Sequence, residues 1–258
     1  MTDTYLIQNG GGIASALGCP DALTRLGVEW QSVTSVLPNE GDDQRRLIES
    51  AEKLYGKETI RIGVVMTPLE MFTKVKFLGN SRIDPCSAKL KREPLKKFIE
   101  ANYDPAHTVL VFGITGVEQR RIPSIEGNWG AQGYRTLFPL RECMWDTRQW
   151  MDWCYEQVGF VPEPYRQGFD HNNCGTACCK AGVSHWKRVL YKNPHVYAEW
   201  EEGEQLWQET MGKDNTMLSR TRDGVKSPLS LRQLREETQA EWADYLPGVH
   251  PYSATIIY

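Results

Sequence analysis

The stretch TVLVFGI at residues 108–114 is the clearest strand signal in the chain, and it decides the fold class. Its apolar and β-branched residues follow one another without the polar alternation that a half-exposed strand shows, which predicts burial on both faces. Strands of this kind belong to parallel sheets that are covered by helices on both sides.

Outward from this stretch, strand-like and helix-like segments alternate along the first two thirds of the chain. Further strands are predicted at residues 5–8, 28–36, 58–65 and 136–140, and helices at 42–54, 90–99 and 147–157. Strands that alternate with helices indicate an α/β protein with a doubly wound, mostly parallel sheet of five strands.

The pattern changes after Cys179, where the chain becomes helical and rich in Trp and Glu, with residues 211–228 predicted as a polar loop. We therefore expect an α/β domain over residues 1–180 and a helical C-terminal extension over 181–258. Between Trp186 and Trp207, apolar residues lie among charged ones. This segment is expected to pack on the core, with a homodimer contact as the alternative.

Composition restricts the classes of function. The 258 residues are 40% hydrophobic and 24% charged, with a formal net charge of −3, which argues against holding nucleic acid by bulk electrostatics. A local basic strip over residues 89–97 keeps a nucleic-acid substrate compatible with this charge. No apolar stretch approaches the ~20 residues that a membrane helix needs, so the protein is predicted to be cytoplasmic and to have no membrane partner.

Three glycines directly follow the first predicted strand. Gly10, Gly11 and Gly12 are followed by Ser15 in a helix-compatible run. Backbone N–H groups at a glycine turn that opens a helix suit a phosphate, and Ser15 would add a hydroxyl. Three glycines in a tight turn have a purely structural role about as often as they bind a phosphate. The spacing matches neither the P-loop nor the dinucleotide fingerprint.

A second polar segment, GITGVEQRR at residues 113–121, follows the clearest strand. Ligands of open α/β sheets bind beyond the carboxyl ends of the strands, which would place Gly113, Glu118 and Arg121 at the rim of the site. Arginine suits phosphate or sulfate because its planar fork makes paired, charge-assisted hydrogen bonds. The alternative is a solvated loop with a surface ion pair.

Seven cysteines, at positions 19, 86, 143, 154, 174, 178 and 179, are an odd number for a disulfide framework. Cys86 falls at a predicted helix N-terminus near Lys89 and Lys91, a place that stabilises a thiolate. The turns after strand–helix units gather at one edge of a doubly wound sheet, so Cys86 is expected to meet Cys174 and Cys178.

These thiolates could bind zinc with His171 as the fourth ligand. Cys179 is the less expected ligand, because adjacent side chains usually diverge. The alternative is a set of unligated thiols in a packed loop.

Taken in order, these motifs resemble a known family. The GGGIAS turn at residues 10–15 is similar to the pyrophosphate loop (PP-loop) of the adenine nucleotide α-hydrolase-like superfamily. The segments PCS at 85–87, GI at 113–114, PL at 139–140 and PY at 164–165 resemble its phosphoadenosine-phosphosulfate (PAPS) reductase branch. The run NNCG at 172–175 looks like uncharacterised members common in bacteriophages, which would place the protein in the host cytoplasm.

The resemblance implies a binding site for an adenine nucleotide, either ATP or a sulfonucleotide, and sulfur transfer or substrate adenylation as the activity. Cys86, Lys89 and Arg121 would be the catalytic residues. Similarity to cluster-dependent tRNA-thiolating relatives implies a [4Fe–4S] cluster on Cys86, Cys174 and Cys178 as an alternative to zinc.

The chain also departs from the family. Gly10 stands where the loop usually has a serine, and Ala14 stands where it usually has an acidic residue. Residues 35–38 (SVLP) occupy the place where relatives often have an acidic-threonine pair that recognises the adenine. The final residues, 253–258, are not the reductases' Glu-Cys-Gly-Leu-His tail. A catalytically degenerate nucleotide-binding protein, such as a phage accessory or counter-defence factor that acts through a partner, is therefore the alternative function.

Overall fold

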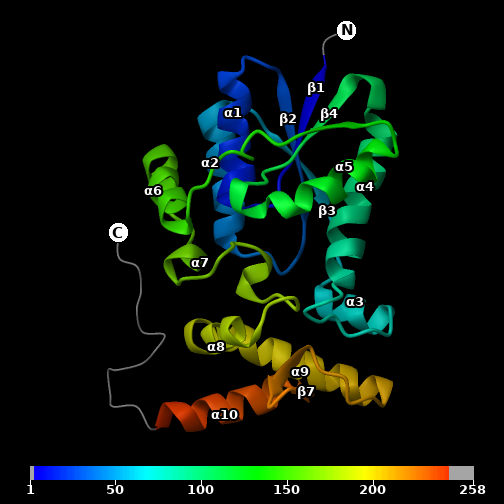
Figure 1. Ribbon diagram of the computed structural model, residues 1–258, viewed down its shortest axis with the longest axis vertical. Coiled ribbons are helices and arrows are strands. Elements are labelled where there is room, and N and C mark those ends of the chain that lie inside the picture. Colours follow the sequence, from blue (N-terminus) through cyan, green and yellow to red (C-terminus); the bar gives the residue numbers. More distant parts are fainter. Residues whose placement is uncertain (1–2, 244–258) are drawn as a thin grey trace.

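The computed structural model describes residues 3–243, and Figure 1 shows its elements. Five parallel strands form the central sheet in the order β3-β2-β1-β4-β5. They are β1 (Thr4–Gln8), β2 (Trp30–Val36), β3 (Thr59–Gly63), β4 (Thr108–Val111) and β5 (Arg135–Leu137). The predicted doubly wound, five-stranded sheet is confirmed. The segment SATIIY at 253–258 lies outside the described residues.

Helices cover both faces of this sheet because its strands are apolar on both sides. Leu6 of β1 packs with Leu95 and Ile99 from one layer of helices, whereas the next residue, Ile7, packs with Cys19 and Leu23 from the other. This is the two-residue period of a strand buried on both faces. β4, which the sequence marks most clearly, is buried at each of its four residues.

The helical elements around the sheet begin and end close to the predicted bounds where their apolar period is regular. They are η1 (Ala14–Gly18), α1 (Cys19–Arg25), α2 (Asp42–Tyr55), α3 (Pro68–Lys74), η2 (Ser87–Arg92), α4 (Glu93–Asn102), η3 (Pro105–His107), η4 (Gly116–Arg121), α5 (Ile122–Gly130), α6 (Thr147–Val158), α7 (Glu163–Arg166) and η5 (Cys174–Thr176). η1 and η2 are π-helical turns that run directly into α1 and α4. Turns of this kind are frequent at functional sites.

The C-terminal part contains a hairpin that the sequence reading missed. It consists of α8 (Val183–Lys192), α9 (Pro194–Met211), the antiparallel strands β6 (Leu218–Arg222) and β7 (Val225–Leu229), and α10 (Leu231–Ala243). The polar loop expected over 211–228 is therefore wrong for the strand residues. Asp223 and Gly224, with φ of +50° and +77°, turn the hairpin. An Asp-Gly pair between short strands is the signal that could have found it.

A large apolar core joins this C-terminal layer to the rest of the molecule. Trp186, Trp200 and Trp207 are buried in it at 0%, 4% and 3% exposure, together with Phe72 and Phe169 from the earlier part of the chain. The expectation that the Trp-rich segment packs on the core is met for these three side chains. The homodimer and the domain boundary at residue 180 stay predictions. None of the helices in residues 3–243 is long and apolar enough to cross a membrane.

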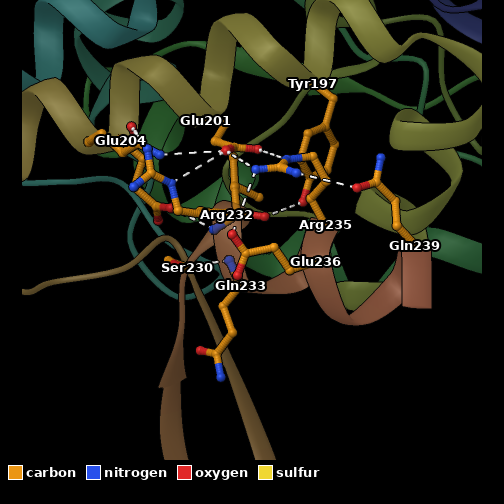
Figure 2. Close-up of polar contacts among 11 residues, drawn as sticks. Tyr197, Glu201, Glu204, Ser230, Arg232, Gln233, Arg235, Glu236 and Gln239 are labelled. Carbon is orange, nitrogen blue, oxygen red and sulfur yellow. Dashed lines mark hydrogen bonds and ion pairs between the residues drawn. The ribbon is translucent and has the colours of Figure 1, made fainter. Parts of the chain in front are cut away.

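Buried carboxylates of α9 hold the hairpin and α10 in place (Figure 2). Glu204, 1% exposed, accepts hydrogen bonds from the backbone N–H of Met217 at 2.8 Å and of Leu231 at 2.6 Å. Glu201 accepts hydrogen bonds from Nε and Nη2 of Arg235, at 2.8 and 3.0 Å. Burial raises the pKa of Glu204, so its carboxylate is retained against a desolvation cost by these two amides.

Replacing Glu204 with Ala should leave two buried amides without an acceptor. We expect the Glu204→Ala variant to lose about 2–4 kcal/mol of unfolding free energy, measured by denaturant titration. Glu202→Ala, an exposed change two residues away on the same helix, is the matched control and should stay within about 0.5 kcal/mol of the wild type. Equal stability of both variants would contradict the role given to Glu204.

Candidate functional site

A cleft of about 990 Å³ opens at the carboxyl ends of β1, β2 and β4. β1 and β4 are neighbours in the sheet although β2 and β3 lie between them in sequence, so the strand order reverses at this point. Such a switch point is where open α/β sheets bind ligands. The lining residues are Gln8, Asn9, Gly10, Thr34, Ser35, Glu40, Ser87, Ala88, Lys91, Arg92, Glu93, Leu95, Lys96, Phe112, Arg120, Arg121, Ser124, Ile125, Asn128, Trp129 and Gln132.

The glycine turn forms the floor beside β1 and is closed by hydrogen bonds of its own. The N–H of Gly11 donates to Asn9 Oδ1 at 2.8 Å, and the N–H of Gly10 donates to Ser15 Oγ at 3.1 Å. Gly11 has a φ of +77°, and a Cβ there would lie 2.4 Å from the side chain of Gln44. The left-handed backbone and the closeness of Gln44 in α2 therefore both favour glycine at this position.

The second predicted segment packs directly on the first. A Cβ at Gly113 would lie 2.9 Å from the backbone of Ser15, so glycine allows the end of β4 to approach the start of η1. Among the predicted nucleotide-binding residues, Gly10 and Arg121 line the cleft, whereas Gly11, Gly12, Ser15 and Gly113 build the wall behind it. Arg121 is paired with Glu118 at 2.6 Å on the exposed rim.

Lys91 is the cleft residue that the sequence reading passed over in favour of Lys89. Lys89 is half-exposed and paired with Glu93 at 2.6 Å, outside the cleft lining. Lys91 lies in the cleft wall, 3.2 Å from Glu40. Burial lowers the pKa of Lys91, but Cys174 and Glu40 more than offset this, so its pKa lies above the usual value. The 3.6-residue period of an α-helix does not predict that Lys91 faces the cleft, because η2 is a π-helix.

Cysteines from two distant segments meet beside Lys91. The Sγ atoms of Cys86 and Cys179 are 3.8 Å apart, and Cys178 directly precedes Cys179 in the same loop. The cysteine that contacts Cys86 is therefore Cys179, which the sequence argument set aside. The joint site of Cys86, Cys174 and Cys178 stays a prediction.

The thiols differ sharply in acidity. The hydrogen bond with Cys179 lowers the pKa of Cys178 to about 6 and is also the main reason that the pKa of Cys86 is lowered. Those two hydrogen bonds raise the pKa of Cys179 far above the usual value. Burial raises the pKa of Cys174 to about 11, although Lys91 acts in the opposite direction. Cys86 and Cys178 are therefore the more acidic thiols of the group, and Cys179 is the one that stays protonated.

The loop that carries Cys174 is strained and anchored on the glycine turn. Cys174, Gly175 and Thr176 have φ values of +55°, +56° and +73°, and left-handed backbone is unusual for cysteine and for a β-branched threonine. Asn172 Nδ2 donates to the carbonyl oxygen of Gly11 at 3.4 Å. Strain of this kind gathers at functional sites.

The predicted zinc or iron–sulfur ligands are not arranged as a metal site. Among residues 3–243, no group of three or more His, Cys, Asp or Glu side chains is placed to hold a metal ion. His171 stacks on His185 at 5.6 Å, and its Nδ1 accepts the backbone N–H of Asn173 at 3.4 Å. Burial lowers the pKa of His171.

No family model and no curated protein matches this chain. Solved structures that match include a predicted subunit of tRNA methyltransferase from Methanocaldococcus jannaschii, 16% identical, with a TM-score of 0.38, covering 60% of this chain and 76% of that one. Another is the U34-tRNA thiolase NcsA from Methanococcus maripaludis with its [4Fe-4S] cluster, 13% identical, with a TM-score of 0.40, covering 80% and 73%. The placement of site residues rests on the geometry of this chain alone.

The low pKa of Cys178 gives a direct prediction. Its alkylation by iodoacetamide, followed by peptide mass spectrometry, should rise with pH around a midpoint of about 6, as the thiolate forms. In a Cys179→Ala variant the midpoint should move upward, because the hydrogen bond that stabilises the thiolate is gone. Cys143, outside this group, serves as the internal control in both proteins. A wild-type midpoint near that of a free cysteine, about 8.5, would contradict the assignment.

Proposed function

We propose that this protein is an adenine-nucleotide-binding enzyme of the PP-loop class that activates a substrate by adenylation or transfers sulfur to it. The observation that carries the proposal is the joining of two sites: the cleft at the β1–β4 switch point and the thiol group share Lys91. A nucleotide in the cleft and a sulfur nucleophile at its edge are the two reactants that such chemistry requires.

The cleft supplies both kinds of surface that a nucleotide needs. Lys91, Arg92 and Arg120 provide positive charge for phosphates, while Phe112 and Trp129 provide flat apolar surfaces for a purine. Buried Gln8 Nε2, also on the cleft, has no hydrogen-bond partner among the described residues. A buried polar group without a partner is costly unless a ligand or water satisfies it, which supports a polar occupant here.

In the proposed reaction, an oxygen of the substrate attacks the α-phosphorus of ATP, and pyrophosphate leaves. The first amides of η1 and the cations of the cleft would offset the charge that develops on the leaving group. A sulfur nucleophile at the thiol group would then displace AMP from the activated substrate. Cys178, as the thiolate, and Cys174, beside Lys91, are the residues placed to take part.

A second candidate is a nucleotide-binding protein without catalysis that acts through a partner. The observation that favours it is the internal hydrogen bonding of the turn, where the N–H groups of Gly10 and Gly11 are already taken by Ser15 and Asn9. With two fewer amides for pyrophosphate, the loop would bind a nucleotide more readily than it would stabilise a leaving group.

ATP binding and pyrophosphate release together test these proposals. We expect calorimetry to detect ATP binding and Arg120→Ala to weaken it about tenfold or more, because a charged hydrogen bond contributes about 1.5–3 kcal/mol. Lys53→Ala, which removes an exposed positive charge from α2, is the control and should bind as the wild type does. Binding without pyrophosphate release, across the candidate substrates offered, would favour the second candidate. No binding of ATP, AMP or a sulfonucleotide would contradict both.

A further inference from the structure

Two cysteines that are 93 positions apart in sequence touch through their sulfur atoms. Cys86 lies at the start of η2, Cys179 lies in the loop between η5 and α8, and their Sγ atoms are 3.8 Å apart. Cys86 is half-buried, whereas Cys179 is 1% exposed. Cys86 is therefore the more accessible residue of the pair, and Cys179 is shielded.

The surroundings hold this pair in place. A Cβ at Gly79 would lie 3.0 Å from Cys179 Sγ, so the absence of a side chain at that position leaves just enough room for the sulfur. Lys180, next to Cys179, forms an ion pair at 3.7 Å with Asp84, two residues before Cys86. This ion pair joins the same two segments as the sulfur contact. The sulfur contact is thus fixed from both sides and does not depend on a flexible loop.

We propose that Cys86 and Cys179 form a redox-active dithiol that closes to an intramolecular disulfide under hydroperoxides. The Cys86 thiolate attacks the O–O bond of the hydroperoxide, becomes a sulfenic acid and releases water or an alcohol. The Cys179 sulfur then attacks the sulfenic sulfur, forming the S–S bond and releasing water. Two thiols lose two electrons and two protons, and one hydroperoxide takes them up.

Pairing of Cys178 with Cys179 is the competing oxidation, and covalent geometry opposes it. The Cα atoms of adjacent residues are about 3.8 Å apart across a trans peptide, whereas disulfides usually span about 4.4–6.8 Å between Cα atoms. The described chain has no cis peptide bond at this or any other position. Cys86 meets no such restriction.

A link at this place would act on the cleft. Cys86 directly precedes η2, which carries Lys91 and Arg92 into the cleft wall, while Cys179 belongs to the core beneath α8 and α9. The disulfide would tie the cleft wall to the C-terminal layer. It would also close a long loop, which restricts the unfolded chain and raises the melting temperature.

Trypsin makes the test direct. Cleavage after lysine and arginine puts Cys86 in the peptide at residues 83–89 and Cys174, Cys178 and Cys179 together in the peptide at residues 167–180. The full-length protein would be treated with stoichiometric hydrogen peroxide, alkylated without reduction, and digested. We expect the two peptides to be joined by a bond that dithiothreitol cleaves, with two fewer free thiols and a melting temperature raised by several degrees.

Matched variants decide which sulfur is used. Cys179→Ser should abolish the joined peptide, whereas Cys178→Ser and Cys143→Ser should both keep it. A link lost in Cys178→Ser but kept in Cys179→Ser would overturn the assignment, as would a disulfide confined to the peptide at 167–180. Zinc or iron bound stoichiometrically in the untreated protein, with the cysteines protected until it is removed, would also overturn it.

Discussion

The burial of β1 and β4 on both faces is the constraint on which the rest of this structure depends. Because these two strands contact helices on both faces, their central residues are apolar, and their polar residues stand at the strand ends. At that edge, Gly113 lets the end of β4 approach the backbone of Ser15, which brings the two polar loops together. The cleft follows from this arrangement. It lies at the ends of β1 and β4, from which the chain continues to opposite sides of the sheet.

Lys91 connects the sheet edge to the thiols through electrostatics. Its ammonium group lies 3.2 Å from the carboxylate of Glu40, 3% exposed, and Cys174 and Glu40 both raise its pKa. A buried cation is stable there because an acidic partner is buried beside it. The same cation faces the cleft, so the charge that stabilises the thiol loop also contributes to the surface offered to a ligand. In the proposed function, this one side chain would couple ligand binding to the sulfur chemistry.

The thiol group shows how hydrogen bonding divides acidity among similar residues. Cys179 lies between Cys86 and Cys178 and lowers the pKa of both, while its own pKa rises. The result is a shielded protonated sulfur between two more acidic ones. This arrangement requires the C-terminal core, because Trp186 and Phe169 bury Cys179 in it.

By itself, the sequence determined the sheet, because periodicity and burial are local properties. The runs at residues 5–8 and 108–114 were sufficient to predict parallel strands with polar loops after them, and Cys86 was correctly placed at the start of a helix. The hairpin around Asp223 and Gly224 was also readable from its turn residues, although the polar composition of 211–228 concealed it.

Only the tertiary structure decided which side chains meet. Lys91 replaces Lys89 in the cleft because a π-helical turn shifts the helical register, and no sequence period reports such a turn. Cys179 contacts Cys86 because the space above Gly79 admits its sulfur, and that space is created by residues far apart in the chain. Contacts of this kind depend on how the layers of helices and the sheet pack against one another. They cannot be predicted from local sequence patterns, because the residues involved are far apart in the chain.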